Sequence, residues 1–280
     1  MNEKICFLIM AHDRIDQLTR LIQTLQYPHF DLYLHLDKKA GVHHFDPALV
    51  TTIADPILVH WGAFTQVEAS LKLLRAAIAS GNKYRYYVII SATDYPLRSN
   101  PDIHQFFMKS ESEYMYSFHS DDAFWHNRYR KHHFNHIHPL PRRLITIFSY
   151  RLQGRIFPYR KLPLLLKPYW GSSWWSLTHE AITYILDFVD RRPEYHEFFR
   201  YTHAADESYY QIILENSPFG ARIKPNLHYV DWSLGGSHPK VMDDEDFDKF
   251  SRGEWLFARK FEMAHNPALL DRIDKELRAC

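Results

Sequence analysis

The sequence predicts an α/β fold in which a mainly parallel central sheet is flanked by helices. Two observations support this expectation. Buried-strand and amphipathic-helix patterns alternate along the first third of the chain, which is typical of successive βαβ units. A length of 280 residues with 46% hydrophobic content is also sufficient for one large hydrophobic core. We therefore expect a single domain over residues 1–280.

The expected elements follow in a regular order. Strand patterns occupy residues 4–12, 30–37, 57–61 and 84–92, and helical patterns occupy 14–26 and 64–80. Gly81 ends the second helix, and turn-forming residues fill 93–102. Later in the chain we expect a short aromatic strand after Gly171, a helix capped by Thr178, a helix after Glu207 and a strand over 223–233.

Candidate ligand-binding residues follow the first four predicted strands. Parallel α/β sheets bind ligands outside the carboxyl ends of their strands. A ligand site is therefore expected at the positions that end these strands: Ala11 and His12, Asp37, Trp61, and Asp94. Each position alone is a weak signal, because loops are polar in any case.

Composition excludes several classes of protein. The formal net charge of +1 gives no overall field that would attract a charged partner. The two cysteines, Cys6 and Cys280, supply neither a disulfide framework nor a zinc spacing, and we expect a reducing compartment. The apolar run at 5–11 is short for a signal peptide, and no run reaches eighteen apolar residues. A soluble or peripherally membrane-attached protein is therefore expected.

An adjacent acid pair, Asp206 and Glu207, precedes the helical pattern at 209–215. One interpretation is that both acids stabilise the positive end of the helix. The other is that one of them is a general base, which must be ionised and within reach of a hydroxyl group. We expect Asp206 to cap the helix and Glu207 to face a cleft as the base.

Cationic and aromatic residues in the second half also suit a sugar nucleotide. The pair Arg259 and Lys260 could bind phosphate oxygens, although its spacing alone favours surface solvation. Tryptophan faces pack against sugar rings, and Trp174, Trp175 and Trp232 are candidates. Neighbouring residues on a strand point to opposite faces, so only one of Trp174 and Trp175 should reach a ligand.

Several stretches together resemble one family, the core-2/I-branching β-1,6-N-acetylglucosaminyltransferases with their relatives the peptide O-xylosyltransferases. The blocks SATDYPLRSN (91–100), DESYYQIILENSPF (206–219), VDWS (230–233) and LFARKFE (256–262) occur in the order of that family. The stretches HLDKK (35–39) and WGSSWWSL (170–177) lie where expected between them. The resemblance covers nearly all of the chain outside a basic region, and we expect a bacterial-type member.

The resemblance implies an inverting, metal-independent glycosyltransferase with a GT-A-type, Rossmann-like sheet and a UDP-sugar donor. It implies that Glu207 is the catalytic base, that Arg259 and Lys260 bind the diphosphate, and that Asp37 contacts uracil. The other residues expected at the donor are Ala11, His12, Trp61, Gly171, Ser173 and Trp174, and those expected at the acceptor are Trp232, Asp94 and Tyr95. Residues 1–122 would form the nucleotide-binding half and 169–280 the catalytic half. No metal and no cofactor are expected.

The donor sugar stays open between two candidates. Xylosyltransferases carry an acid where this chain has Ser173, which favours N-acetylglucosamine. The blocks 91–100 and 214–219, however, are closer to the xylosyltransferase side, so UDP-xylose is the alternative. A non-catalytic glycan- or nucleic-acid-binding module on the same scaffold is an alternative of another class. The expected acceptor is a glycan or lipid-linked glycan in surface polysaccharide or glycolipid synthesis.

Residues 123–179 contain no acid and ten lysines and arginines. We expect residues 123–168 to be a basic insertion, broken by prolines, with regular structure only around 142–153. It could contact an anionic membrane surface or an acidic acceptor, or simply be a solvated basic face. Its histidines lack zinc-site spacing. No nucleic-acid partner is expected, and the expected location is the cytoplasm, with peripheral attachment to the inner membrane left open.

Overall fold

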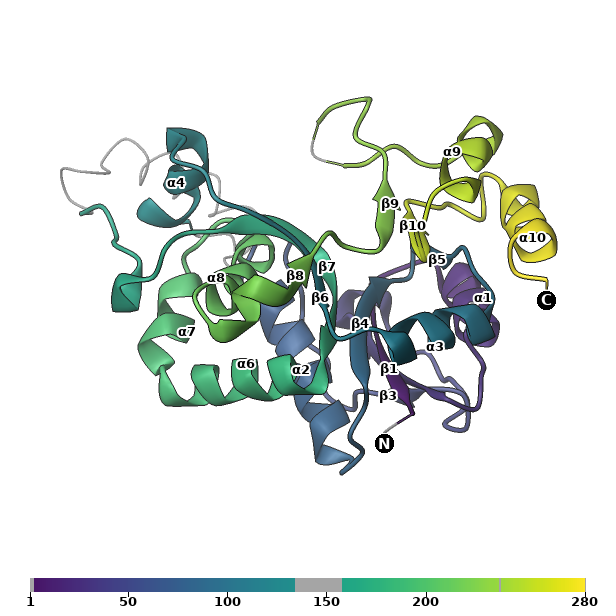
Figure 1. The fold of residues 1–280 in the computed structure, drawn as a ribbon, viewed down its shortest axis with the longest axis horizontal. Helices are drawn as coiled ribbons and strands as arrows, with labels where there is room; N and C mark the ends of the chain where they lie inside the picture. Colours follow the sequence, from purple (N-terminus) through teal and green to yellow (C-terminus); the bar gives the residue numbers. More distant parts are fainter. Residues whose placement is uncertain (1–2, 134–157, 237, 280) are drawn as a thin grey trace.

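The computed structural model describes residues 3–133, 158–236 and 238–279, and it confirms the α/β prediction. In this part of the chain a seven-stranded sheet has the order β3-β2-β1-β4-β7-β6-β8 (Figure 1). β7 alone runs antiparallel to its two neighbours, so the sheet is mainly parallel. The strands are β1 (Ile5–Ala11), β2 (Phe30–Leu36), β3 (Thr51–Thr52), β4 (Tyr86–Ser91), β6 (Glu113–Phe118), β7 (Trp170–Thr178) and β8 (Ile223–Lys224).

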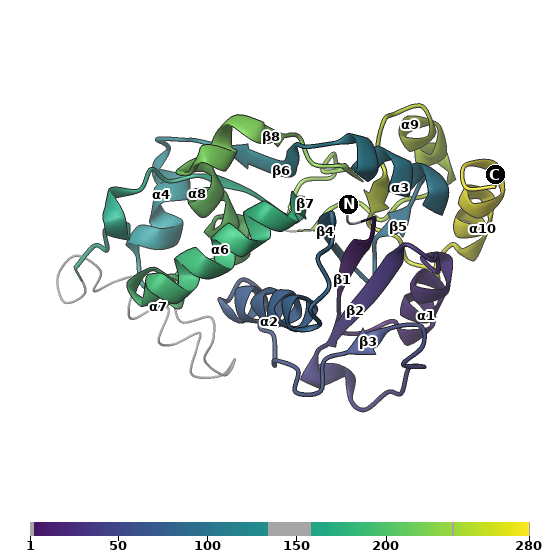
Figure 2. The same ribbon diagram turned by 60° about the horizontal axis from the view of Figure 1, so that its bottom comes forward.

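Alternating side chains of the central strands build a hydrophobic cluster on each face of the sheet. In β1, Phe7 and Ile9 belong to one cluster, whereas Cys6 and Leu8 belong to the other. The first cluster is covered by α1 (Ile15–Thr24), α3 (Asn100–Lys109) and α10 (Pro267–Glu276). The second is covered by α2 (Thr65–Ala79), α6 (His179–Arg191), α7 (Pro193–Phe199) and α8 (Tyr209–Glu215), as Figure 2 shows for α2 and α6.

A small second sheet brings the C-terminal part of the chain to the carboxyl ends of β1 and β4. It has the order β5 (Tyr95–Pro96), β10 (Phe257–Arg259) and β9 (His228–Val230), with α9 (Phe247–Ser251) beside it. The Gln17 amide donates to the carbonyls of Ala92 and Phe261, at 2.9 and 3.1 Å. The Phe261 N–H donates to the Thr93 carbonyl at 2.9 Å. Residues 257–263 are thereby fixed where the sequence predicts a ligand.

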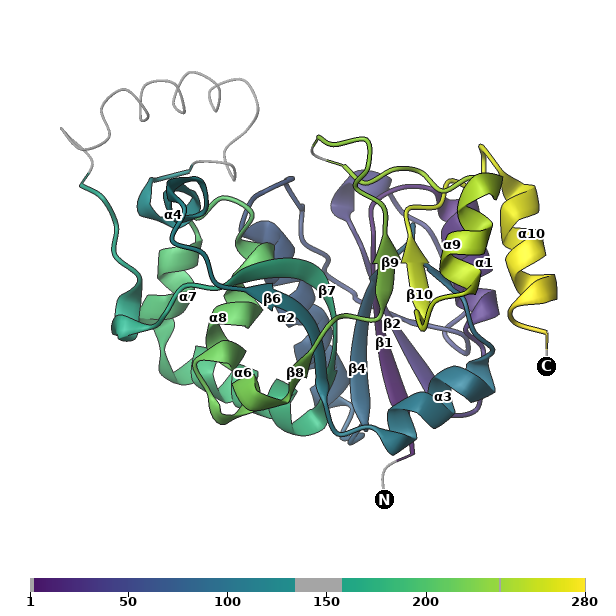
Figure 3. The same cartoon turned by 45° about the horizontal axis from the view of Figure 1, so that its top comes forward.

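The described ends of the basic region pack against the segment that leads to the acid pair. α4 (Ala123–Arg130) lies beside α7 and α8 in Figure 3, and the His203 N–H donates to the Arg128 carbonyl at 2.9 Å. The Arg160 guanidinium donates to the carbonyls of Phe198 and Tyr201. Residues 158–160 therefore support the end of α7, although we expected only an insertion. The predicted regular stretch 142–153 lies outside the described residues.

Two local predictions are wrong, and several helices were missed. Residues 57–61 form no strand, because the N–H groups of Ile57 and Val59 donate to the side chains of His35 and Asp37. The predicted strand 223–233 is divided between β8 and β9, which belong to different sheets. Helices α3, α4, α7, α9 and α10 were not anticipated. Among the described helices none is long and apolar enough to cross a membrane.

Candidate functional site

The acid pair lies in a short 3-10 turn, Ala205–Glu207, immediately before α8. The prediction that Asp206 caps this helix is wrong: Ser208 is the N-cap residue, and no side chain caps the helix. The Asp206 carboxylate instead accepts a hydrogen bond from the Ser173 hydroxyl. Burial, together with the nearby charge of Glu207, raises the pKa of Asp206 to about 6.

Glu207 faces outward and forms an ion pair with Arg128 of α4. The Arg128 Nη2 lies 2.6 Å from the Glu207 Oε2, and the side chains are 13% and 37% exposed, respectively. The guanidinium also lies over the Trp125 ring, 5.1 Å from its centre. Sequence reasoning missed Arg128, because the two residues are 79 positions apart and no local pattern joins them. The one sequence feature that could have pointed to Arg128 is the lack of acidic residues in 123–179, which leaves this arginine without a local partner.

Arg259 is mostly enclosed. Its guanidinium lies over the Trp174 ring at 4.2 Å, and its Nε lies 3.2 Å from the Asp94 Oδ1, without the alignment of a hydrogen bond. Asp94 is completely buried and also accepts the Ser91 N–H at 2.6 Å. Burial raises the pKa of Asp94, whereas the charge of Arg259 lowers it.

Two expected acceptor residues are corrected by these contacts. Asp94 has no exposed surface for an acceptor, and its carboxylate neutralises Arg259. Tyr95 is also completely buried, and its hydroxyl lies 3.0 Å from the Thr24 hydroxyl and 2.8 Å from the Asp274 carboxylate. Both residues follow a strand, as predicted, but both side chains turn into the protein. They support the site without reaching a ligand.

Lys260 is more accessible than Arg259 and faces the carboxyl end of β1. Its Nζ lies 3.4 Å from the Glu262 carboxylate, which also accepts the Arg14 Nη2 at 2.7 Å. These contacts lower the pKa of Glu262 against the opposing effect of its burial. Two cations thus share one carboxylate next to His12, which is exposed. The Asp13 carboxylate lies 3.7 Å from the Arg14 Nε, so two carboxylates balance the two cations here.

The middle of β7 connects the acid pair with the Arg259 side. Ser173 contacts Asp206, and the next residue, Trp174, contacts Arg259. Trp175 is buried against Tyr210, with ring centres 5.2 Å apart, so the two indoles lie on opposite faces, as the strand pattern predicts. Glu207, Asp206, Ser173, Trp174 and Arg259 therefore form one continuous path of neighbours and contacts.

Close packing between β6 and β7 explains why position 171 is a glycine. A Cβ at this position would collide with the carbonyl oxygen of Tyr116 in β6 and would lie 3.2 Å from the Gln211 amide nitrogen. The absence of a side chain therefore permits close pairing of β6 with β7. Strand packing therefore explains the glycine, and the donor contact of Gly171 stays a prediction.

Ala11 and Asp37, which end or follow the first two strands, hold the neighbouring loop segments. Ala11 is buried, and its carbonyl accepts the Asp37 N–H at 2.8 Å. Asp37 is nearly buried and accepts the N–H groups of Lys39 and Val59, at 2.9 and 3.1 Å. The uracil contact of Asp37 stays a prediction, and its visible role is to hold two loop segments.

Trp61 and Trp232 are both exposed. The Trp61 ring lies 5.9 Å from the ring of His203, and the carbonyl of the following residue, Gly62, accepts the Ala204 N–H at 2.9 Å. The ring of His238 lies 6.1 Å from Trp61, which brings the loop after Trp232 toward the same place. An open aromatic surface therefore borders the turn that carries Glu207.

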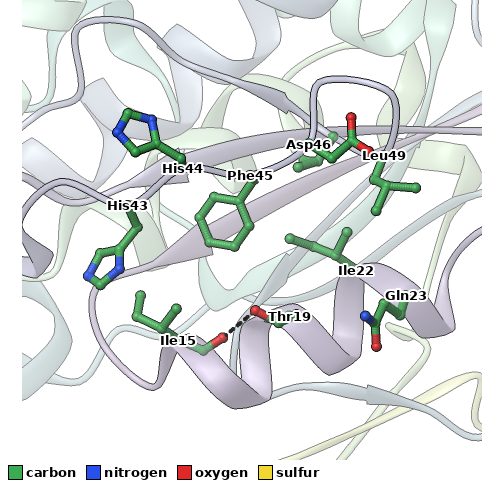
Figure 4. Close-up of a pocket in the computed structure, with 10 residues that line it drawn as sticks. Ile15, Thr19, Ile22, Gln23, His43, His44, Phe45, Asp46 and Leu49 are labelled. Carbon is green, nitrogen blue, oxygen red and sulfur yellow. Dashed lines mark hydrogen bonds between the residues drawn. The ribbon is translucent and has the colours of Figure 1, made fainter.

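A separate pocket lies between α1 and residues 43–50 (Figure 4). Phe45 faces Ile15, Thr19 and Ile22 of the helix there. None of the predicted site residues lines this pocket. Within residues 3–133, 158–236 and 238–279, no cluster of three or more His, Cys, Asp or Glu side chains could hold a metal ion.

Comparisons with known proteins agree with this arrangement of motifs. Xylosyltransferase 2 of Rattus norvegicus is 25% identical over 305 residues, which cover 98% of this chain and 34% of that protein. Xylosyltransferase 1 of Rattus norvegicus is 23% identical over 306 residues, which cover 98% of this chain and 35% of that protein. The chain thus spans about a third of the length of these curated relatives.

The chain is also similar to a solved structure and matches a family profile. The apo crystal structure of mouse xyloside xylosyltransferase 1 is 10% identical, with a TM-score of 0.36, over 91% of this chain and 97% of that chain. A TM-score this low supports no conclusion about this chain. The profile described as Core-2/I-Branching enzyme matches residues 5–251, which is most of the sequence. The chain therefore belongs to the Core-2/I-Branching enzyme family.

Proposed function

We propose that the protein is an inverting glycosyltransferase that moves a sugar from a UDP-sugar to a hydroxyl group of a glycan acceptor. The observation that carries the proposal is the Glu207 carboxylate. It is partly exposed beside an aromatic surface, and a fixed cation contacts one of its two oxygens. Family membership and the names of the relatives support transfer of a sugar.

The proposed reaction is one in-line displacement. The acceptor oxygen attacks the anomeric carbon and gives its proton to Glu207, while the bond from that carbon to the UDP oxygen breaks with its electron pair leaving on the phosphate. Arg259 and Lys260 stabilise the negative charge that develops there, a role in which one lost donor commonly costs roughly 100-fold in rate. Trp174 holds Arg259 in place, and Lys260 is the cation with the more accessible side chain.

The proposed donor sugar is N-acetylglucosamine, and UDP-xylose is the second candidate. Ser173 supplies a neutral hydroxyl at the position where the resemblance places an acid in xylosyltransferases, and this hydroxyl is already bonded to Asp206. The relatives named xylosyltransferase favour the second donor. Metal independence is also part of the proposal, supported by the two cations that could offset the diphosphate charge. The acceptor would belong to surface polysaccharide or glycolipid synthesis.

A panel of UDP-sugars tests the proposal by release of UDP, with and without chelator or manganese. We expect UDP-N-acetylglucosamine to be hydrolysed fastest, and Glu207→Gln to bind donor normally while turnover falls at least about 100-fold. The control is Glu197→Gln, which removes an exposed carboxylate of α7 that pairs with Arg200. Normal turnover by Glu207→Gln would contradict the assignment of the base. Turnover that required manganese would contradict metal independence.

The alternative class, a non-catalytic binding module, makes a different prediction. Such a module would be stabilised thermally by a glycan or a nucleic acid but would release no UDP from any donor. Specific stabilisation scales with ligand concentration relative to the dissociation constant, so UDP itself is the discriminating ligand. A rise in melting temperature with UDP supports the transferase, and salt-sensitive RNA binding without that rise supports the module.

A further inference from the structure

Among the described residues, Arg128 is the cation that contacts Glu207, the predicted base. Its Nη2 donates to the Glu207 Oε2 at 2.6 Å, and within the described ranges no other group hydrogen bonds to that carboxylate. The Oε1 atom is therefore left for another donor. A carboxylate held through one oxygen presents the other in a fixed direction, which is what proton transfer from an alcohol requires.

The arginine is itself held firmly. Its guanidinium is 13% exposed and lies over the Trp125 ring at 5.1 Å. Its carbonyl accepts the His203 N–H at 2.9 Å, which joins the end of α4 to the segment three residues before the acid pair. The Asp122 side chain caps the start of α4 through the Phe124 N–H at 2.7 Å. Arg128 and Glu207 are therefore fixed relative to each other by backbone as well as side-chain contacts.

We propose that Arg128 is a positioning residue for Glu207: it holds Oε2 and leaves Oε1 for the acceptor hydroxyl. This inference rests on the proposed transferase function. Arg128 belongs to the basic region, which neither the motifs nor the expected site residues had connected with catalysis. The described part of the basic region would then help to orient the catalytic base.

Charge distribution around the pair supports the assignment. The charged groups that act on Glu207 are Arg128 from α4, which contacts it, and Asp206 from its own turn. Two adjacent carboxylates repel each other, and within the described ranges Glu207 is the one that forms an ion pair. Asp206 is buried, and its pKa is raised to about 6. The ion pair and hydrogen bond with Arg128 thus distinguish Glu207 from its buried neighbour as the carboxylate that an acceptor hydroxyl could reach.

The test compares Arg128→Gln and Arg128→Lys with a matched control on the same helix. Arg130→Gln is the control, because the exposed Arg130 side chain lies over Tyr159 and away from the acid pair. For the best UDP-sugar we expect Arg128→Gln to lower kcat at pH 6 at least about 10-fold with little change in KM, as for a weakened general base. The acid limb of its pH–rate profile should move to higher pH. Arg128→Lys should restore part of the rate, and Arg130→Gln should match the wild type.

A second measurement does not depend on turnover. The thermal stabilities of Arg128→Gln, Glu207→Gln and the double variant form a cycle in which a direct pair gives non-additive effects. Non-additivity together with the shifted acid limb supports the proposal. Additive stabilities, or an Arg128→Gln profile that superimposes on that of the wild type, would overturn it. A wild-type protein inactive on every UDP-sugar would instead overturn the proposed function, and the stability cycle would still report whether the pair exists.

Discussion

Two regions of the molecule contain the same three groups in different surroundings. Near β10, Arg259 lies over Trp174 and pairs with Asp94. Near α4, Arg128 lies over Trp125 and pairs with Glu207. Asp94 is completely buried, and its nearest approach to Arg259 is not aligned as a hydrogen bond, whereas Glu207 is 37% exposed and is hydrogen bonded at 2.6 Å.

The difference shows which member of each pair is free to meet a ligand. At the buried pair the carboxylate cannot be reached, so Asp94 fixes and neutralises the cation. At the partly exposed pair the guanidinium is the more enclosed member, so Arg128 fixes the carboxylate. An indole restricts the guanidinium in both cases. Burial, rather than the kind of residue, therefore separates supporting carboxylates from the one proposed to react.

The largest effect is expected from breaking the buried pair with Asp94→Asn. Asparagine keeps the size of the side chain and can still accept the Ser91 N–H, but it leaves Arg259 enclosed without a counter-charge. Breaking a buried ion pair in this way should cost about 4 kcal/mol of unfolding free energy. The melting temperature, measured by calorimetry, should fall by roughly 10 °C. An unchanged melting temperature would show that Asp94 does not support Arg259.

The same contrast explains how far the sequence alone could lead. The continuous apolar run at 5–11 predicts a buried strand. The opposite faces of Trp174 and Trp175, seen in their contacts with Arg259 and Tyr210, follow from the strand period. The inward turn of Asp94 could not be predicted, because its partner Arg259 is remote in sequence. The apolar run at 57–61 has a strand pattern, but side chains of β2 and the following turn occupy its N–H groups. Contacts between residues that are remote in sequence leave no periodic pattern in the local sequence, so they could not be predicted from it.

The second prediction concerns the pH dependence that Asp206 adds beside the exposed pair. Its pKa is about 6 in the folded protein, against 3.8 ordinarily, so the folded state binds more protons between these values. The unfolding free energy should therefore decrease as pH rises from 4 to 6, by about 2 kcal/mol from this group. Asp206→Asn lacks the titration, so its stability relative to the wild type should increase over that range. Urea unfolding at pH 4, 5, 6 and 7 measures both curves, and parallel curves would refute the assignment.

A third prediction separates the two cations of LFARKFE. Lys260→Ala should weaken UDP binding about tenfold, which is about 1.4 kcal/mol. It should hardly change stability, since Lys260 has a partly exposed ion pair with Glu262. Arg259→Ala should weaken binding too, but it should also destabilise the protein, because it leaves Asp94 buried and unpaired. Calorimetric titration with UDP and thermal unfolding distinguish the two variants. Equal losses of stability would remove the distinction between the cations.

The smallest effect is expected at an arginine–carboxylate pair that lacks both burial and an indole contact. Arg75 of α2 and Asp190 of α6 lie 2.5 Å apart, with side chains 48% and 57% exposed. The hydrogen bond from Arg75 lowers the pKa of Asp190, so this pair stabilises the fold above the ordinary pKa of aspartate and loses its effect as pH falls through the lowered value. Water and salt screen both charges, and Asp190→Asn should cost about 0.5 kcal/mol at pH 7. Thermal unfolding at low and high salt measures this difference. A loss as large as that of Asp94→Asn would show that burial does not set the strength of these pairs.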